Sequence, residues 1–130
     1  MPSLFTKIVA GEIPCAKVWE NDEFLAFLDI MPVTPGHMLV IPKKETDYLF
    51  DLDSGEYGRL MQAAKTVAIG LKKATGCQRV SLSVWGFEVP HVHVHLIPMN
   101  SLGEFPFPAN RTKATPEALL AMASKIKPAL

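Results

Sequence analysis

The sequence predicts an α+β fold in which a mostly antiparallel five-stranded sheet is combined with one long helix and short terminal helices. Two observations support this fold class. Five short runs of strand-forming residues alternate with turn residues, and between the third and fourth run the apolar residues recur at helical spacing. With 130 residues, of which 48% are hydrophobic and 20% charged, the chain is expected to bury a single core.

The first part of the chain predicts a short helix followed by a hairpin. The amphipathic segment 4–10 fits one or two helical turns before a glycine. The runs at 16–20 and 23–30 flank a short polar turn, which is typical of a β-hairpin. Two prolines and a glycine at 31–36 exclude regular structure, and 37–41 follows as a largely buried strand.

The second part predicts the long helix, two strands and a last helix. Asp53 or Ser54 can cap the long helix, and Gly76 is expected to end it. Segments 78–84 and 91–97 are predicted to be strands. The remaining features are a loop at 85–90, an extended or loose stretch at 101–113 with Phe-Pro-Phe-Pro at 105–108, and a helix opened by Thr115 and Pro116.

Charge and cysteine content exclude several classes of protein. Lys+Arg and Asp+Glu number 13 each, so no basic field is available to hold a long nucleic acid, whereas a small anionic ligand fits this balance. Cys15 and Cys77 are far apart and without partners at metal-binding spacing, which indicates a reduced intracellular protein. No run is apolar enough for a signal peptide or a membrane span, so we expect a cytoplasmic protein without membrane contact.

Three of the four histidines alternate in the segment His91-Val92-His93-Val94-His95. On a strand the three imidazoles would share one face, and the valines would point into the core. Three interpretations follow: a polar face that happens to use histidine, a transition-metal site, or catalysis in which one imidazole attacks while its neighbours orient it. No HExxH, CxxC or HxHxD pattern supports a metal, and a strand that fixes the rings suits catalysis.

This histidine segment resembles the signature of the histidine triad (HIT) family of nucleotide hydrolases and transferases. Residues 5–14, 26–30 and 35–44 are similar to the same family in order and spacing. The resemblance runs from about Leu4 to Pro98. It implies a single HIT-like domain over residues 1–130, with a core at 4–98 and a C-terminal tail at 99–130.

The resemblance also implies the catalytic roles. His93 would attack the α-phosphorus of a nucleotide and form a nucleotidyl-histidine intermediate. His95 would hydrogen-bond the phosphate or the bridging oxygen, and His91 would orient the nucleophile. His37 matches a fourth family histidine beside the triad, although taken alone it reads equally well as a buried interior histidine.

A nucleotide-binding set follows from the same resemblance. Asp29 would accept hydrogen bonds from the ribose hydroxyls, although taken alone it reads as a turn-capping aspartate. Apolar walls would sandwich a purine base, adenine or guanine, although their plainest interpretation is ordinary core. The full nucleotide-binding set is Asp29, Phe5, Ile8, Phe27, Ile30, Leu4 and Glu88.

The sequence departs from the family pattern in three places, one of which is Met99, where an arginine often follows the Ile-Pro pair. Many bacterial relatives bind structural zinc through Cys-x-x-Cys and a histidine, where this chain has Ser3, Thr6 and Glu45, so we predict no metal and no cofactor. In the loop before the triad, Phe87 replaces the usual glutamine, and Glu88 offers no donor when ionised. The phosphate would therefore find fewer hydrogen-bond donors here.

The prediction is an enzyme that cleaves a phosphoramidate or mixed-anhydride adduct of a purine nucleoside monophosphate. One alternative is a dinucleoside polyphosphate hydrolase, for which Arg79, Arg111 or Lys113 would contact the longer leaving group only if the tail folds over the site. The other is a non-catalytic nucleotide-binding or interaction module. The resemblance implies a homodimer, which Trp19 and Trp85 would permit as exposed aromatic residues.

Overall fold

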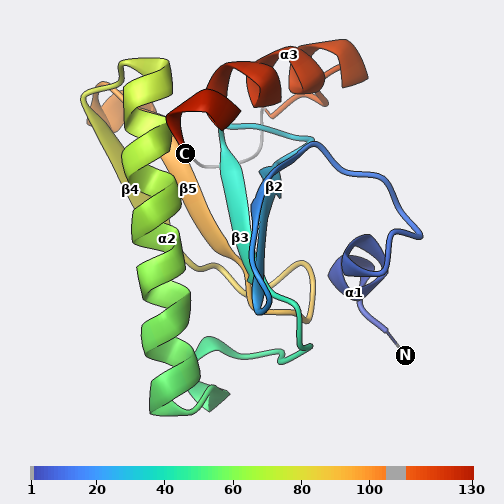
Figure 1. The fold of residues 1–130 in the computed structure, drawn as a ribbon. Helices are drawn as coiled ribbons and strands as arrows, with labels where there is room; N and C mark the ends of the chain where they lie inside the picture. The colour runs from blue at the N-terminus through green and yellow to red at the C-terminus, as the bar shows by residue number, and fades with distance from the viewer. Residues whose placement is uncertain (1, 105–110) are drawn as a thin grey trace.

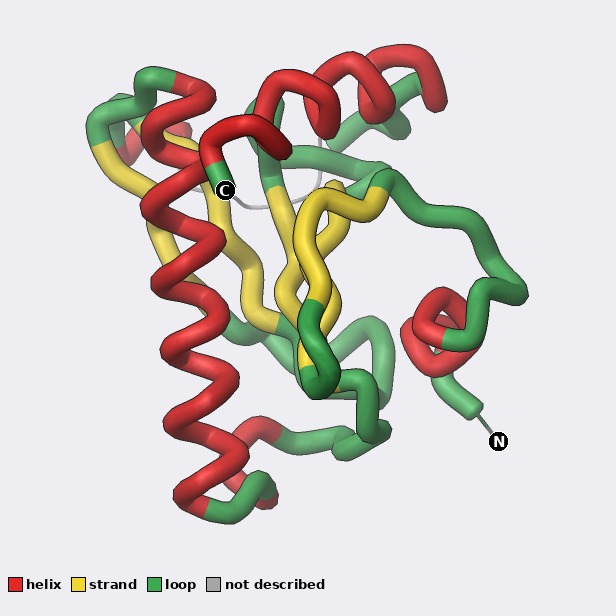
Figure 2. Tube along the Cα trace, viewed as in Figure 1, coloured by secondary structure: helices red, strands yellow, loops and turns green. Residues whose placement is uncertain are grey.

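One antiparallel sheet organises the fold. The computed structural model describes residues 2–104 and 111–130, so the Phe-Pro-Phe-Pro stretch at 105–108 lies outside the described residues. Every neighbouring pair of strands is antiparallel, in the order β1-β2-β3-β5-β4 (Figures 1 and 2). The predicted fold class is confirmed. The strands are β1 (Lys17–Glu20), β2 (Phe24–Leu28), β3 (Met38–Pro42), β4 (Arg79–Ser83) and β5 (Val94–Met99).

The two faces of the sheet are covered by different helices. The long helix α2 runs along one face, α1 lies on the opposite side, and α3 crosses one end (Figure 1). The C-terminus returns to the side of α2 (Figure 1). The helices are α1 (Leu4–Val9), α2 (Ser54–Thr75) and α3 (Pro116–Ile126), with short 3-10 turns η1 (Leu49–Asp51), η2 (Leu102–Glu104) and η4 (Lys127–Ala129).

Strand alternation divides the buried side chains between these two faces. Ala26, Val40 and Val94 belong to the core under α2, whereas Phe27 and Leu39 contact Phe5 of α1 or its neighbours. Leu39 is paired in register with His95 of β5. The imidazole of His95 therefore lies on the α1 side of the sheet, together with the smaller apolar cluster.

The helix boundaries follow the capping residues that the sequence predicts. The Asp53 carboxylate accepts a hydrogen bond from the Glu56 amide at 2.7 Å and caps α2. Gly76 adopts the left-handed conformation, with φ of 68°, directly after the helix. Thr115 caps α3 through a 3.1 Å bond from the Ala118 amide. These three expectations are confirmed.

Two expectations are wrong. The last strand begins at Val94 rather than at His91, because the Val92 amide donates to the Thr46 carbonyl at 2.7 Å and the chain has not yet joined the sheet. Trp19 and Trp85 are both half-buried rather than exposed, since Trp19 packs on the α2-side core and Trp85 stacks on His95.

No helix among the described residues is long and apolar enough to cross a membrane. Homodimer formation stays a prediction.

Helix α2 meets the C-terminus so closely at Gly70 that a side chain cannot fit. A Cβ there would lie 2.8 Å from the Ala129 carbonyl oxygen and would overlap a Leu130 methyl carbon, whereas a Cβ at Gly58 in the same helix meets nothing within 4 Å. We expect Gly70→Ala to lower the free energy of unfolding by about 1–3 kcal/mol. The matched Gly58→Ala should raise it by up to about 1 kcal/mol. Urea denaturation measures both, and equal effects would contradict the close contact.

Candidate active site

A pocket of about 260 Å³ opens between α1, the end of β2 and the loop that precedes β5. His93 and His95 line it, whereas His91 and His37 lie behind its wall, and all four imidazoles are at most 5% exposed. The structure brings the whole predicted nucleotide-binding set into the same pocket. Its members are Leu4, Phe5, Ile8, Phe27, Asp29, Ile30 and Glu88.

Within residues 2–104 and 111–130, hydrogen bonding leaves one nitrogen of His93 without a partner. Nδ1 lies 2.6 Å from the carbonyl oxygen of His91, and because a carbonyl only accepts, Nδ1 carries the proton. In the neutral imidazole, Nε2 then keeps its lone pair. Phe5 packs edge-on against the ring, with centroids 4.9 Å apart, and holds its orientation. The available nucleophilic atom of His93 is therefore Nε2.

A chain of hydrogen bonds fixes the proton of His95. The Val33 amide donates to Nδ1 of His37 at 3.0 Å, so the His37 proton lies on Nε2 and is donated to Nδ1 of His95 at 2.9 Å. His95 must then carry its own proton on Nε2. That buried atom has no partner among the described residues. A buried N–H without a partner next to a pocket is a donor that awaits a ligand.

Burial keeps this pair neutral. Desolvation lowers the pKa of His95 to about 2, and the neighbouring His37 and His93 contribute in the same direction. Burial likewise lowers the pKa of His37 to about 3, with a further contribution from the charge of Arg111. Trp85 supplies part of the dry surroundings, because its ring stacks on His95 at 3.6 Å between centroids. His95 can therefore donate a hydrogen bond but does not act as a cation near neutral pH.

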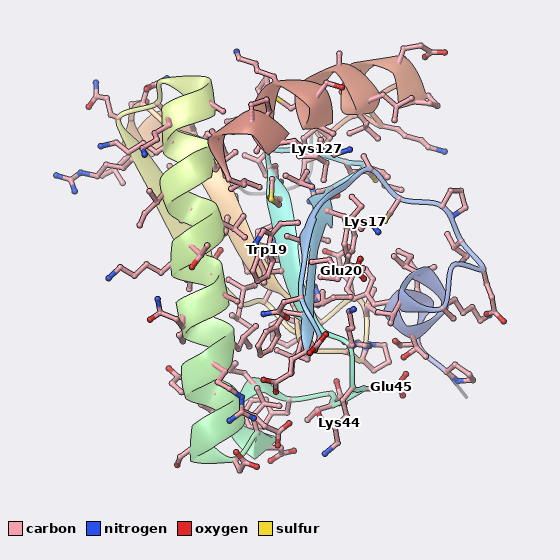
Figure 3. The ribbon with its side chains drawn as sticks, viewed as in Figure 1. Lys17, Trp19, Glu20, Lys44, Glu45 and Lys127 are labelled. Carbon is pink, nitrogen blue, oxygen red and sulfur yellow. The ribbon has the colours of Figure 1, made fainter. Side chains whose placement is uncertain are left out.

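His91 is held between the sheet and the N-terminal segment. Its Nε2 donates to the Pro42 carbonyl at 2.7 Å, so Nδ1 accepts from the Ser3 hydroxyl at 2.7 Å. Thr6 donates its own hydroxyl to Glu45, and Glu45 also accepts from the Ser3 amide, both at 2.6 Å. These two bonds lower the pKa of Glu45 to about 2. Glu45 lies on the loop after β3, beside α1 (Figure 3).

The family resemblance places the structural zinc ligands of bacterial relatives at Ser3, Thr6 and Glu45, and His91 lies beside these residues. Ser3 and Thr6 offer hydroxyls and Glu45 offers a single carboxylate, whereas structural zinc sites are built from thiolates and imidazoles. The donor set therefore does not fit zinc. Hydrogen bonds join Ser3, Thr6, Glu45 and His91 instead, and we call these four residues the anchor network.

Asp29 combines both roles that the sequence left open. One carboxyl oxygen accepts from the Met31 amide at 2.8 Å and so caps the turn after β2. The other lies 3.5 Å from Nε2 of His37 and 3.6 Å from the Arg111 guanidinium. Burial raises the pKa of Asp29, although the Met31 amide and the charge of Arg111 oppose the shift. A polar group of a ligand can reach this carboxyl from the pocket.

One further set of groups stands at metal-binding spacing in the described part of the chain. Single ligand atoms of Asp29, His37 and His95 lie within 4.8 Å of one another. His37 and His95 already satisfy each other at 2.9 Å, so a cation would have to displace that hydrogen bond. The prediction that the chain binds no metal stays a prediction.

Two residues that shape the pocket were not assigned to it from the sequence, which named Arg111 only as a conditional contact for a longer leaving group and Trp85 only as an exposed aromatic residue. Arg111 lines it from the tail, with a side chain only 11% exposed. Trp85 covers His95 and lies 5.3 Å, measured from its ring centroid, from the guanidinium carbon of Arg111. The tail does fold against the site here, because the Ala114 amide donates to the Ile30 carbonyl at 2.8 Å. Arg79 lies on the edge strand β4 and, like Lys113, is not among the residues that line the pocket.

Comparison with known proteins identifies the family. A model of the HIT domain matches residues 10–102, well over half of the chain. The chain belongs to the HIT family. Structural comparison agrees. A Hit-like protein from Bartonella henselae, described as involved in cell-cycle regulation, superposes with a TM-score of 0.87 at 34% identity, and the alignment covers 98% of this chain and 96% of that one.

Two curated relatives show how similar other HIT proteins are. An uncharacterized HIT-like protein of Borreliella burgdorferi is 37% identical over 102 residues, which is 73% of each chain. The adenosine 5′-monophosphoramidase of Schizosaccharomyces pombe is 40% identical over 100 residues, which is 75% of this chain and 74% of the relative.

The close approach of the four side chains of the anchor network can be tested by converting them into a metal site. We expect the triple variant Ser3→Cys, Thr6→Cys, Glu45→His to bind about one zinc ion per chain, because His91 Nδ1 is already within reach of the first two positions. Visible absorption after Co²⁺ addition reports tetrahedral thiolate coordination. The matched control carries Glu45→Gln, lacks the third new ligand and should bind far more weakly. A folded triple variant without metal would contradict the geometry.

The neutral histidine pair should make this HIT protein less stable in mild acid. In the unfolded chain both rings bind protons below about pH 6.5, whereas in the folded chain they resist until about pH 2–3. Stability should therefore fall as the pH drops from about 6.5 towards 3, by at most about 1.4 kcal/mol per pH unit for each ring. NMR of the ring protons gives the direct check. Titration of His37 or His95 near pH 6.5 in the folded protein would contradict this assignment.

Proposed function

We propose that this HIT-family chain is a nucleotide hydrolase or transferase that attacks the α-phosphate of a purine nucleoside monophosphate adduct through His93. The observation that carries the proposal is the state of that ring. Nδ1–H is fixed on the His91 carbonyl, and Nε2 is left with its lone pair in a pocket. Neutral imidazole is a good nucleophile near pH 7, provided that its second nitrogen is held in this way.

The proposed reaction has two displacements. The lone pair of His93 Nε2 forms a bond to the α-phosphorus while the bond from phosphorus to the leaving group breaks, which gives a nucleotidyl-histidine intermediate. The leaving group departs with the bonding electron pair and takes up a proton from solvent. Water then attacks the same phosphorus and loses a proton to solvent, the phosphorus–nitrogen bond breaks, and the nucleoside monophosphate leaves as His93 regains its lone pair. An acceptor other than water in the second step would make the protein a transferase.

His95 is the proposed hydrogen-bond donor to the phosphate or bridging oxygen. Its buried Nε2–H has no partner among the described side chains and backbone groups, and it is held in place through His37 and Val33. A fixed N–H donor in a dry site stabilises developing negative charge without reorganisation of solvent. His91 acts behind the nucleophile, because its carbonyl oxygen sets the tautomer of His93.

The remaining walls of the pocket suit a nucleoside. Phe5 and Phe27 meet edge-to-face with centroids 5.7 Å apart, and Leu4, Ile8 and Ile30 extend this apolar lining. An apolar slot with few polar groups accepts a flat base and discriminates weakly between purines. The oxygen of Asp29 that does not cap the turn is the proposed acceptor for the ribose hydroxyls.

The substrate class is supported by one relative. The Schizosaccharomyces pombe relative is named an adenosine 5′-monophosphoramidase. We therefore propose a phosphoramidate or mixed anhydride of AMP or a related nucleotide as substrate. Hydrolysis of a dinucleoside polyphosphate is the second candidate, and the observation in its favour is that Arg111 of the tail lines the pocket.

Assembly as a homodimer belongs to the same proposal. Strand β4 is the last strand of the sheet, and exposed apolar side chains lie on it and on α2, with Leu82 49% and Ile69 50% exposed. An edge strand with apolar neighbours can pair with a second copy across a two-fold axis.

The decisive experiment compares wild type with His93→Ala on adenosine 5′-phosphoramidate and on a dinucleoside polyphosphate, without added metal. We expect AMP release by wild type, a loss of at least about 10³-fold in the variant, and unchanged AMP binding. Intact-mass measurement after an alkaline quench should detect a nucleotidyl adduct on wild type alone. The faster substrate chooses between the two candidates. If both proteins bind AMP and both are inert, the chain is a non-catalytic nucleotide-binding module.

A further inference from the structure

The charge of the pocket is unfavourable for a phosphate unless one residue compensates. Two carboxyl groups, of Asp29 and Glu88, line it. The imidazole of His95 adds no positive charge, because its burial lowers its pKa far below neutrality. Among the described residues that line the pocket, Arg111 is the single lysine or arginine. An anionic ligand therefore depends on Arg111 for attraction.

Arg111 is held in position before any ligand arrives. Its Nη1 donates to the Met31 carbonyl at 3.1 Å and lies 3.6 Å from the Asp29 carboxyl. The guanidinium carbon lies 5.3 Å from the centre of the Trp85 ring, within the range of a cation–π contact. The Ala114–Ile30 backbone bond ties the following tail segment to the turn after β2. Contacts with Met31, Asp29 and Trp85 therefore fix the Arg111 side chain before a ligand binds.

The guanidinium still has unused hydrogen-bonding capacity. Its Nε is buried and has no partner in the described part of the chain. Nη2 reaches Glu88 only at 3.5 Å, the outer limit of a hydrogen bond, and the Glu88 side chain is 61% exposed. A weak, solvent-exposed pair of this kind contributes little and can be exchanged for a better acceptor. The nitrogens Nε and Nη2 together present the fork that binds two oxygens of a phosphate.

We propose that Arg111 binds the α-phosphate of the nucleotide, and that Glu88 is the counter-ion it leaves when the nucleotide enters. The inference rests on the proposed function and adds to it a phosphate-binding residue from the tail. In this chain Phe87 and Glu88 stand where the family resemblance implies phosphate donors, and Phe87 is 95% exposed. Arg111 supplies the charge that this loop lacks.

The same placement serves the proposed chemistry. A guanidinium on the phosphate oxygens reduces the negative charge that a neutral imidazole must approach. Its field also contributes to the low pKa of His95 and His37, so the Nδ1 lone pair of His95 stays available to His37. Arg111 would thus bind the substrate and help to keep the donor next to it neutral.

The test separates charge recognition from structural support by comparing AMP with adenosine. Isothermal titration of wild type, Arg111→Ala and Lys113→Ala measures both affinities, and Lys113 is the matched control because it is an exposed cation of the same segment. We expect Arg111→Ala to weaken AMP binding by about ten-fold or more and to leave adenosine binding unchanged. Lys113→Ala should change neither. Equal losses for both ligands, or no loss for AMP, would overturn the proposal.

Two further readouts locate the contact. Loss of kcat/KM in Arg111→Ala should be similar for the phosphoramidate and the dinucleoside polyphosphate, since both share the α-phosphate; a loss confined to the polyphosphate would overturn the assignment. Glu88→Gln should tighten AMP binding, and weaker binding would contradict the role as counter-ion. If wild type neither binds AMP nor turns over either substrate, the proposed function itself fails, whereas an active wild type with an unaffected Arg111→Ala refutes the Arg111 assignment alone.

Discussion

The site depends on the placement of protons among four buried imidazoles. Main-chain groups do most of this work: the Val33 amide sets His37, the Pro42 carbonyl sets His91, and the His91 carbonyl sets His93. Each of these main-chain groups belongs to a different turn or strand end. The tautomers of the imidazoles therefore depend on the backbone geometry that the sheet fixes. The pairing of β3 with β5 brings His95 beside His37 and completes the chain. A one-residue slip in that register would turn His95 towards the core under α2.

Segments from both ends of the chain complete what the sheet begins. Helix α1 supplies Phe5 on one side of His93, and the anchor network ties this helix to His91. From the other end, Arg111 reaches the carboxyl of Asp29 and the ring of Trp85. The apolar part of the pocket therefore comes from the N-terminal half, and its one described guanidinium comes from the tail. The sheet and its strand ends hold the imidazoles, whereas the terminal segments contribute an aromatic wall and a guanidinium.

Local signals in the sequence were sufficient for the elements that local physics determines. Asp53, Gly76 and Thr115 mark helix ends because capping is a contact within one turn. Alternation placed Val92 and Val94 in the core but could not reveal that the strand starts at Val94, since Val92 bonds to a loop distant in sequence. The residues gathered around the nucleotide pocket were found through family resemblance. Arg111 had been named only as a conditional contact and Trp85 only as an exposed aromatic residue, because their contacts join segments that no local pattern connects.

The anchor network has a consequence for the conditions under which the protein keeps its shape. A site of thiolates and zinc must acquire its ion, can lose it to chelators and can be damaged by oxidants. Ser3, Thr6 and Glu45 hold α1 against His91 with two hydroxyls and a carboxylate, none of which undergoes that chemistry. Attachment of this wall of the pocket is thus independent of zinc supply and of thiol redox state. Hydrogen bonds among residues of the chain itself thus attach α1 to the rest of the pocket, without a metal cross-link.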